Sequence, residues 1–215
     1  PLPAWARAEA ATPPRPEAPR APSELGGDKV LAGETADDAL PEAAAKRRGR
    51  QIHTLLEVLP VHPPEKWPEV AGRLLASGAD RAEPGAIPAL LAEAAAVLDA
   101  PGLAPVFAPG GLAEVGIAAP LDALGGGRIL GYVDRLIVEP GRVLAVDFKS
   151  NAIVPTRPED VPEGLLRQMG AYAAALGQVY PDRRIETAIL WTRTAELMVL
   201  PAPLVAAALA RAGAS

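Results

Sequence analysis

Two apolar runs joined by a tight turn constrain the fold of this chain more than any other part of its sequence. Residues 128–138 and 143–149 are rich in Val, Ile and Leu, and the turn signal Pro140-Gly141 separates them. This pattern is typical of an antiparallel β-hairpin. Because most side chains of both runs are apolar, we expect the strand pair to be buried.

The rest of the chain from residue 41 alternates between helical and extended patterns. Apolar residues at helical spacing, with Ala-rich stretches, predict helices over 42–59, 67–80, 86–99, 163–178 and 202–213. Short apolar runs bounded by Gly and Pro predict strands over 112–118, 128–138, 143–149, 185–193 and 196–200. Helices, then a strand meander, then a helix and further strands predict an α/β fold with a small central sheet flanked by helices.

Residues 1–40 differ in composition from the rest of the chain. Proline occupies seven of the first 22 positions, and large apolar side chains are scarce. Such a segment buries too little surface to offset its ordering entropy, so we expect a Pro-rich linker or tail over 1–40 and one domain over 41–215. Because the chain starts at Pro1 rather than Met, we expect it to be a piece of a longer protein.

Composition excludes several classes of site. The chain has no cysteine, which excludes disulfides, thiolate zinc sites and iron–sulfur clusters. No apolar run reaches the roughly 18 residues of a membrane span, and no signal-peptide pattern opens the chain. No phosphate-binding loop of the type G-x-x-x-x-G-K-[ST] occurs, so we expect no ATP site in this chain.

The hairpin carries the strongest chemical signal. With Pro140-Gly141 at the turn, Asp134 lies directly opposite Asp147, and Lys149 points to the same face two residues on. Opposed carboxylates repel, and burial makes the conflict more costly. A divalent cation such as Mg²⁺ or Mn²⁺ removes it, since both ions prefer oxygen ligands. The alternative is that Lys149 merely forms an ion pair with one of the acids.

Four motifs resemble those of the PD-(D/E)xK nucleases of the RecB-like branch. They are a G-x-x-D segment ending in Asp134, the triplet from Asp147 to Lys149, a Q-x-x-x-Y segment from Gln168 to Tyr172, and the upstream segment from Arg48 to Glu57, which matches R-G-x-x-x-H-x-x-L-E. Within that branch, the sequence around these motifs is most similar to the nuclease domains of AddA-type helicase–nuclease subunits. The resemblance covers residues 41–200 well and the Pro-rich segment loosely.

The resemblance implies a restriction-endonuclease-like core with a mixed sheet, preceded by inserted N-terminal helices. It also implies a metal site formed by His53, Asp134, Asp147 and the Phe148 carbonyl, with Lys149 acting on the water or the phosphate. Gln168 and Tyr172 would orient Lys149 and the substrate phosphate. From the residues alone, Tyr172 also fits the apolar stripe of its helix, with Gln168 at the exposed edge of that stripe.

Two further features concern the surroundings of this site. Glu114 lies on the strand before the hairpin and could reach the metal, although its spacing is loose and a purely structural role is slightly favoured. Arg47, Arg48 and Arg50 form a basic cluster before His53. Charge runs are usually solvated helix faces, but this cluster would stand at the entrance of the site, so we expect it to contact DNA phosphates.

The resemblance implies a Mg²⁺- or Mn²⁺-dependent DNA exonuclease domain of an ATP-dependent helicase–nuclease in double-strand-break repair and recombination. Its partners would be DNA and the AddB subunit, its target the 3′-terminated strand, and its location the bacterial cytoplasm. ATP would bind only to motor domains outside this chain. The alternatives are a stand-alone RecB-family or Cas4-like exonuclease, the latter disfavoured by the missing cysteines, and a catalytically silent DNA-binding module of the same fold.

Overall fold

A five-stranded sheet forms the centre of the computed structural model, which describes residue 3, residues 18–30 and residues 41–214. The strands lie side by side in chain order: β1 (Leu112–Pro120), β2 (Arg128–Glu139), β3 (Arg142–Lys149), β4 (Arg184–Trp191) and β5 (Glu196–Leu200). All neighbours are antiparallel except β3 and β4, which are parallel. The sheet is therefore mixed, as the resemblance implied.

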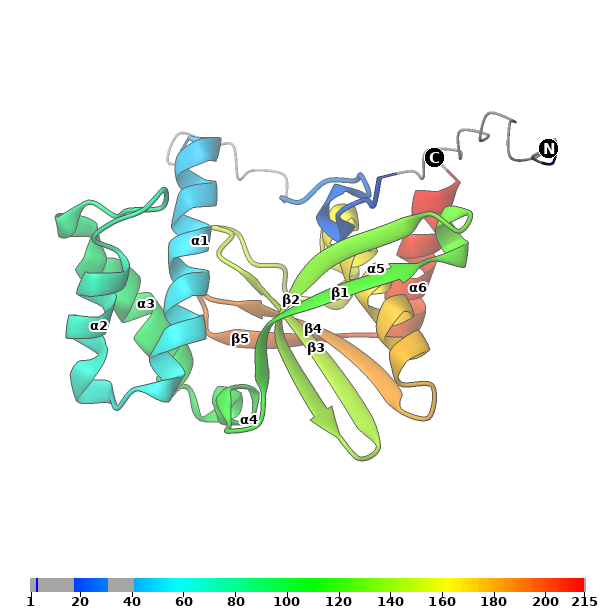
Figure 1. Cartoon of the computed structure of the whole chain (residues 1–215). Helices are drawn as coiled ribbons and strands as arrows, with labels where there is room; N and C mark the ends of the chain where they lie inside the picture. Colours follow the sequence, from blue (N-terminus) through cyan, green and yellow to red (C-terminus); the bar gives the residue numbers. More distant parts are fainter. Residues whose placement is uncertain (1–2, 4–17, 31–40, 215) are drawn as a thin grey trace.

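Helices cover both faces of the sheet (Figure 1). The helix α5 (Glu163–Val179) is the crossover that the parallel pair β3–β4 requires, and it packs with α6 (Ala202–Gly213) on one face. The helices before the sheet pack on the other face; they are α1 (Glu42–Val58), α2 (Trp67–Leu74), α3 (Ile87–Asp99) and α4 (Ala104–Phe107). The predicted α/β architecture with N-terminal helices is confirmed.

The alternation of side chains along β3 explains the two cores. Val143 and Ala145 point to the α5–α6 side, whereas Leu144, Val146 and Phe148 point to the α1–α4 side. All five are buried. The strand that carries the predicted acid Asp147 therefore lies in the middle of the molecule, as its apolar sequence indicated.

Two helical predictions differ from the structure. The helix expected over 67–80 ends at Leu74, and the chain then turns at Gly78, which has a positive φ of +89°. The Pro- and Gly-rich stretch 101–111 holds the short helix α4, which the sequence pattern did not predict. Short 3₁₀ turns connect the remaining elements; they are η3 (Leu59–Val61), η4 (Pro64–Lys66), η5 (Pro84–Ala86), η6 (Pro101–Leu103), η7 (Asp122–Leu124) and η8 (Pro158–Asp160).

Part of the segment expected to be a tail packs on the domain, which corrects the predicted boundary at residue 40. Arg20 bridges in parallel to Ile129 of β2, and the 3₁₀ turn η2 (Pro22–Glu24) comes directly after it. Pro22 and Leu25 are buried. The composition argument missed this contact because most of it consists of backbone hydrogen bonds, with only Pro22 and Leu25 as buried side chains. The same prediction for residues 1–2, 4–17 and 31–40 lies outside the described residues.

Within the described residues, no single helix is long and apolar enough to cross a membrane. Residues Pro84–Asp99 and Pro101–Phe107 reach that length and apolarity only together, across a bend of 69°.

Candidate active site

The two predicted acids stand where β2 and β3 separate. The strands pair in the predicted register from Glu139–Arg142 back to Arg135–Val146, and the ladder ends one residue before Asp134 and Asp147. In place of a backbone partner, the Phe148 N–H donates a hydrogen bond to Asp134 Oδ2 at 2.6 Å. The fork between the strands thus leaves room for side-chain chemistry in the middle of the sheet.

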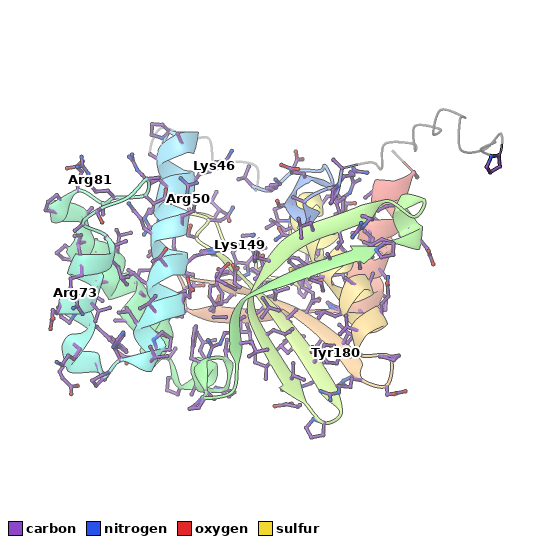
Figure 2. The ribbon with its side chains drawn as sticks, in the orientation of Figure 1. Lys46, Arg50, Arg73, Arg81, Lys149 and Tyr180 are labelled. Carbon is purple, nitrogen blue, oxygen red and sulfur yellow. The ribbon has the colours of Figure 1, made fainter. Side chains whose placement is uncertain are left out.

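Asp147 is held on the α5 side of this fork. Its side chain is buried, Gln168 Nε2 donates a hydrogen bond to its Oδ1 at 2.6 Å, and Lys149 forms an ion pair with its Oδ2. Burial raises the pKa of Asp147 despite the opposing effect of the Lys149 charge. Burial alone would lower the pKa of Lys149, but the charges of Asp147 and Asp134 outweigh it and raise that pKa. Figure 2 places Lys149 at the centre of the molecule, where the strands cross.

His53 reaches the fork from α1. Its Nε2 lies 3.0 Å from the Phe148 carbonyl oxygen, and its Nδ1 lies 3.2 Å from Asp134 Oδ1. Burial opposes protonation of the ring, but the hydrogen bond and charge of Asp134 raise the pKa of His53 overall. The same partnership lowers the pKa of Asp134 against the effect of its burial. Both ring nitrogens face oxygen acceptors, so positive charge is favoured at this point, either as a proton on the ring or as a bound metal ion.

Glu114 lies at the same candidate site, beside His53 and Asp134. The pairs Ala113–Arg135 and Val115–Val133 flank it, so its position in the register is opposite Asp134. Its φ of +50° lies in the left-handed region, which a Glu side chain disfavours. Burial, then the charges of Asp134 and Glu57, raise its pKa. Backbone strain at a cluster of like charges is typical of a functional site.

The donor set fits a divalent cation. One potential ligand atom from each of His53, Glu114 and Asp134 lies within 4.8 Å of the others. Two carboxylates and an imidazole suit Mn²⁺ and are acceptable to Mg²⁺. These residues line a pocket of about 370 Å³ with Glu57 and Arg50, whereas a larger pocket of about 600 Å³ between α5, α6 and β4 is lined mostly by small apolar residues. Asp147 lies outside the three-residue group, since its oxygens face Gln168 and Lys149.

Gln168 and Tyr172 are both buried on α5 and connect the acid to the neighbouring strand. Gln168 Nε2 also donates to the Tyr172 hydroxyl at 3.2 Å, and that hydroxyl donates to the Tyr132 carbonyl at 2.6 Å. Gln168 is therefore not the exposed edge of an apolar stripe. It contacts Asp147 rather than Lys149, so the described contacts orient the acid.

The basic cluster divides into residues with different surroundings. Arg48 forms an ion pair with Glu93 of α3, and Arg50 forms one with Asp80 at 2.6 Å. Arg48 therefore ties α1 to α3, whereas Arg47 is exposed. Figure 2 shows Arg50 on α1. The entrance predicted for DNA is thus lined by arginines of which two already have acidic partners.

Comparison with known proteins agrees with this geometry. Residues 29–205 match the family model of the PD-(D/E)XK nuclease superfamily. No curated protein matches the chain. The match spans the sheet, the fork with its two acids and lysine, and the helix α1 that supplies His53. From the acid pair at the fork, the mixed sheet around it and this match, we conclude that the chain belongs to the PD-(D/E)XK nuclease superfamily.

Proposed function

We propose that this chain is a divalent-metal-dependent deoxyribonuclease domain in which the fork between β2 and β3 hydrolyses phosphodiester bonds. The observation that carries the proposal is the convergence of His53, Glu114 and Asp134 beside the buried pair of Asp147 and Lys149. A catalytically silent module would have no reason to keep three carboxylates and a lysine together against their mutual repulsion and desolvation cost.

His53, Asp134, Asp147 and the Phe148 carbonyl would hold the metal, with Glu114 as a further carboxylate. When bound, a divalent metal polarises the scissile phosphate and lowers the pKa of a water molecule. Lys149 would stabilise the charge that develops on the phosphate or position the attacking water. Gln168 would keep Asp147 oriented through the hydrogen bond to its Oδ1. Tyr172 and Gln168 would thereby act as positioning residues.

Within this activity, we assign the domain to an AddA-type helicase–nuclease that processes double-strand breaks with an AddB partner and cuts the 3′-terminated strand as an exonuclease. The order of the four motifs and the sequence around them support this assignment. Arg47 would contact DNA phosphates at the entrance, and ATP would be used only by motor domains outside this chain. A stand-alone RecB-family exonuclease is the alternative, and binding of purified AddB subunit to the chain distinguishes the two.

A cleavage assay tests the activity. We expect the chain to degrade end-labelled linear DNA with Mg²⁺ or Mn²⁺ but not with EDTA, and labels on the 3′ or the 5′ end report the strand polarity. The variant Asp134→Asn should abolish cleavage while the chain still folds, as a cooperative melting curve checks. Asp182→Asn, which changes an exposed carboxylate outside the site, is the matched control. Cleavage that is unaffected by Asp134→Asn would contradict the proposal.

A further inference from the structure

One face of the first half of β2 is apolar and open to solvent. Ile129 and Val133 are fully buried on the side of α5, whereas Leu130 and Tyr132 between them are 50% and 62% exposed. Because side chains alternate along a strand, Leu130 and Tyr132 share the other face. In Figure 1 this part of the β1–β2 ribbon extends away from α1, with α5 behind it.

The facing positions on β1 carry only small side chains. Gly116 pairs with Tyr132, Ala118 with Leu130, and Pro120 with Arg128. A methyl group on Gly116 would lie 3.5 Å from Tyr132 Cε1, so the phenol ring lies against the backbone of β1 at that point. The small side chains on β1 therefore leave the Tyr132 side chain open to solvent.

This surface is continuous with the proposed active site. Along the same strand face, Asp134 lies two residues beyond Tyr132, at a distance of about 6.6 Å. Glu114 lies at the facing position on β1. The backbone of Tyr132 is fixed by the hydrogen bond from Tyr172, which is in turn hydrogen-bonded to Gln168 on Asp147. The backbone from which the ring projects is thus held at a set position relative to the carboxylates.

The charges along this face of β1 and β2 also favour binding of a nucleic acid strand. Arg128 is exposed at the far end of the same face, and none of the six paired positions from Gly116 to Pro120 and from Arg128 to Tyr132 on this face is acidic. A strand whose phosphate enters the acid pocket would pass its next nucleotides over Tyr132 and Leu130 toward the cation of Arg128. Exposed apolar side chains that occur singly need no explanation, but here two adjoin a catalytic pocket in line with a cation.

We propose that Tyr132, with Leu130 beside it, is a stacking platform for an unpaired nucleobase next to the scissile phosphate. The proposal rests on the nuclease activity proposed above and adds the substrate class: the base must be unpaired, so the domain prefers single-stranded DNA. Aromatic rings stack with any base, which suits degradation without sequence preference.

Binding of a labelled single-stranded oligonucleotide in Ca²⁺ tests this platform. Removing one base-stacking ring costs about 1–3 kcal/mol, so Tyr132→Ala should weaken binding about 5- to 150-fold. Tyr132→Phe should bind like the wild type, because the ring remains. Val199→Ala, which truncates a 51% exposed side chain on β5, is the matched control and should also bind normally.

Oligonucleotides with a single abasic site identify the contact. In the wild type, one position should weaken binding when its base is absent, and in Tyr132→Ala the same abasic site should have no further effect. Equal binding by Tyr132→Ala and wild type, or additive losses from the two changes, would overturn the platform. If the wild type still cleaves DNA in Mn²⁺ in that case, only the platform fails. If the wild type neither binds nor cleaves, the proposed function fails with it.

Discussion

At the scale of single residues, the pair of Lys149 and Asp147 combines a structural and a chemical role. Their side chains are 20% and 4% exposed, and removing one partner of a buried ion pair leaves an uncompensated charge. Lys149 also carries a positive charge beside the two acids, which suits it to stabilise a phosphate. Stability and catalysis must therefore be measured separately for this residue.

Replacing Lys149 separates the two roles. Lys149→Ala should lower the melting temperature in the absence of metal and reduce the cleavage rate by about 10²–10³-fold at saturating Mn²⁺, the scale of losing one electrostatic stabiliser. Lys149→Arg should restore the melting temperature but not the rate, because the guanidinium keeps the charge and changes the donor geometry. Melting curves beside single-turnover rates provide the measurement. Full activity in the Ala variant would remove Lys149 from the mechanism.

Replacing Glu114 should affect stability and metal affinity in opposite directions. Glu114→Gly removes the carboxylate and also relieves a left-handed backbone that costs a non-Gly residue about 1–2 kcal/mol. We expect this variant to melt at or above the wild-type temperature, since the greater flexibility of Gly offsets part of the relief. Glu114→Gln keeps the strain.

Both Glu114 variants should weaken Mn²⁺ binding at least about tenfold, as measured by calorimetry. Asp182→Asn is again the control with an unchanged affinity. A wild-type affinity in both variants would show that Glu114 is not a ligand, and its strained φ would then need another cause.

At the scale of elements, the described residues from Arg20 to Asp28 pack on the domain, and Leu25 belongs to its core. Leu25 is 3% exposed, and its carbonyl oxygen accepts a hydrogen bond from Arg167 of α5. Gly164 donates its N–H to the Asp28 carbonyl at 2.7 Å, and a methyl group on Gly164 would lie 2.7 Å from that oxygen. Pro22 packs equally closely on Gly131, which accounts for a glycine three residues before Asp134. The segment therefore lies between β2 and α5, next to the strand that carries the site.

Truncation of Leu25 measures this packing. Leu25→Ala should cost about 2–3 kcal/mol, the lower part of the range for buried Leu, and lower the melting temperature by about 5–10 °C in a chain of this size. Val199→Ala, on an exposed face of β5, should have little effect. An unchanged melting temperature for Leu25→Ala would instead support a weakly packed tail.

An ion pair joins α5 and α6, and its contribution to stability has a predictable pH dependence. Glu163 of α5 accepts hydrogen bonds from Arg211 of α6 at 2.8 and 2.9 Å and from Arg167 at 3.1 Å. These hydrogen bonds lower the pKa of Glu163 below its ordinary value of 4.5, and the bond from Arg211 has the largest effect. The Glu163 carboxylate therefore takes up a proton less readily in the native protein than in the unfolded chain. The stability that its ion pairs provide is complete above about pH 5 and disappears as the pH falls through the native pKa.

Glu163→Gln should accordingly melt about 1–4 °C below wild type at pH 7, since a partly exposed pair contributes about 0.5–1 kcal/mol. The difference should shrink as the pH is lowered below 4.5 and vanish once Glu163 is protonated in both states. Glu159→Gln, an exposed acid on η8, serves as the control. A difference that stays constant down to acid pH would show that the loss is one of packing rather than charge.

At the scale of the whole molecule, local pattern predicted most of the elements and long-range packing decided what it missed. Turn chemistry and apolar runs predicted the hairpin and its register, and the predicted stripe of Ile52, Leu55 and Leu56 on α1, with Leu59 directly after the helix, is buried. The parallel pairing of β3 with β4 left no local signal, since it depends on where α5 crosses the sheet. Docking of Leu25 and the approach of Glu114 to Asp134 likewise depend on contacts between distant segments.

The site shows the same division between local and distant information. Strand alternation predicted Asp134, Asp147 and Lys149, and the motifs identified His53, Gln168 and Tyr172. The left-handed φ of Glu114 and the ion pair of Arg48 with Glu93 are set only by the assembled structure. The exposed ring of Tyr132 had one usable signal in the sequence: an aromatic residue two positions before the first acid, on the strand face that Asp134 shares.

The central claim is that the fork between β2 and β3 binds a divalent metal. Anomalous diffraction from crystals soaked in Mn²⁺ tests it most directly, because the scattering locates the ion without reference to activity. We predict a peak bounded by His53, Asp134 and Asp147 and the Phe148 carbonyl, within reach of Glu114, which is absent from crystals of Asp134→Asn. A peak elsewhere in the molecule, or none at saturating Mn²⁺, would contradict the account.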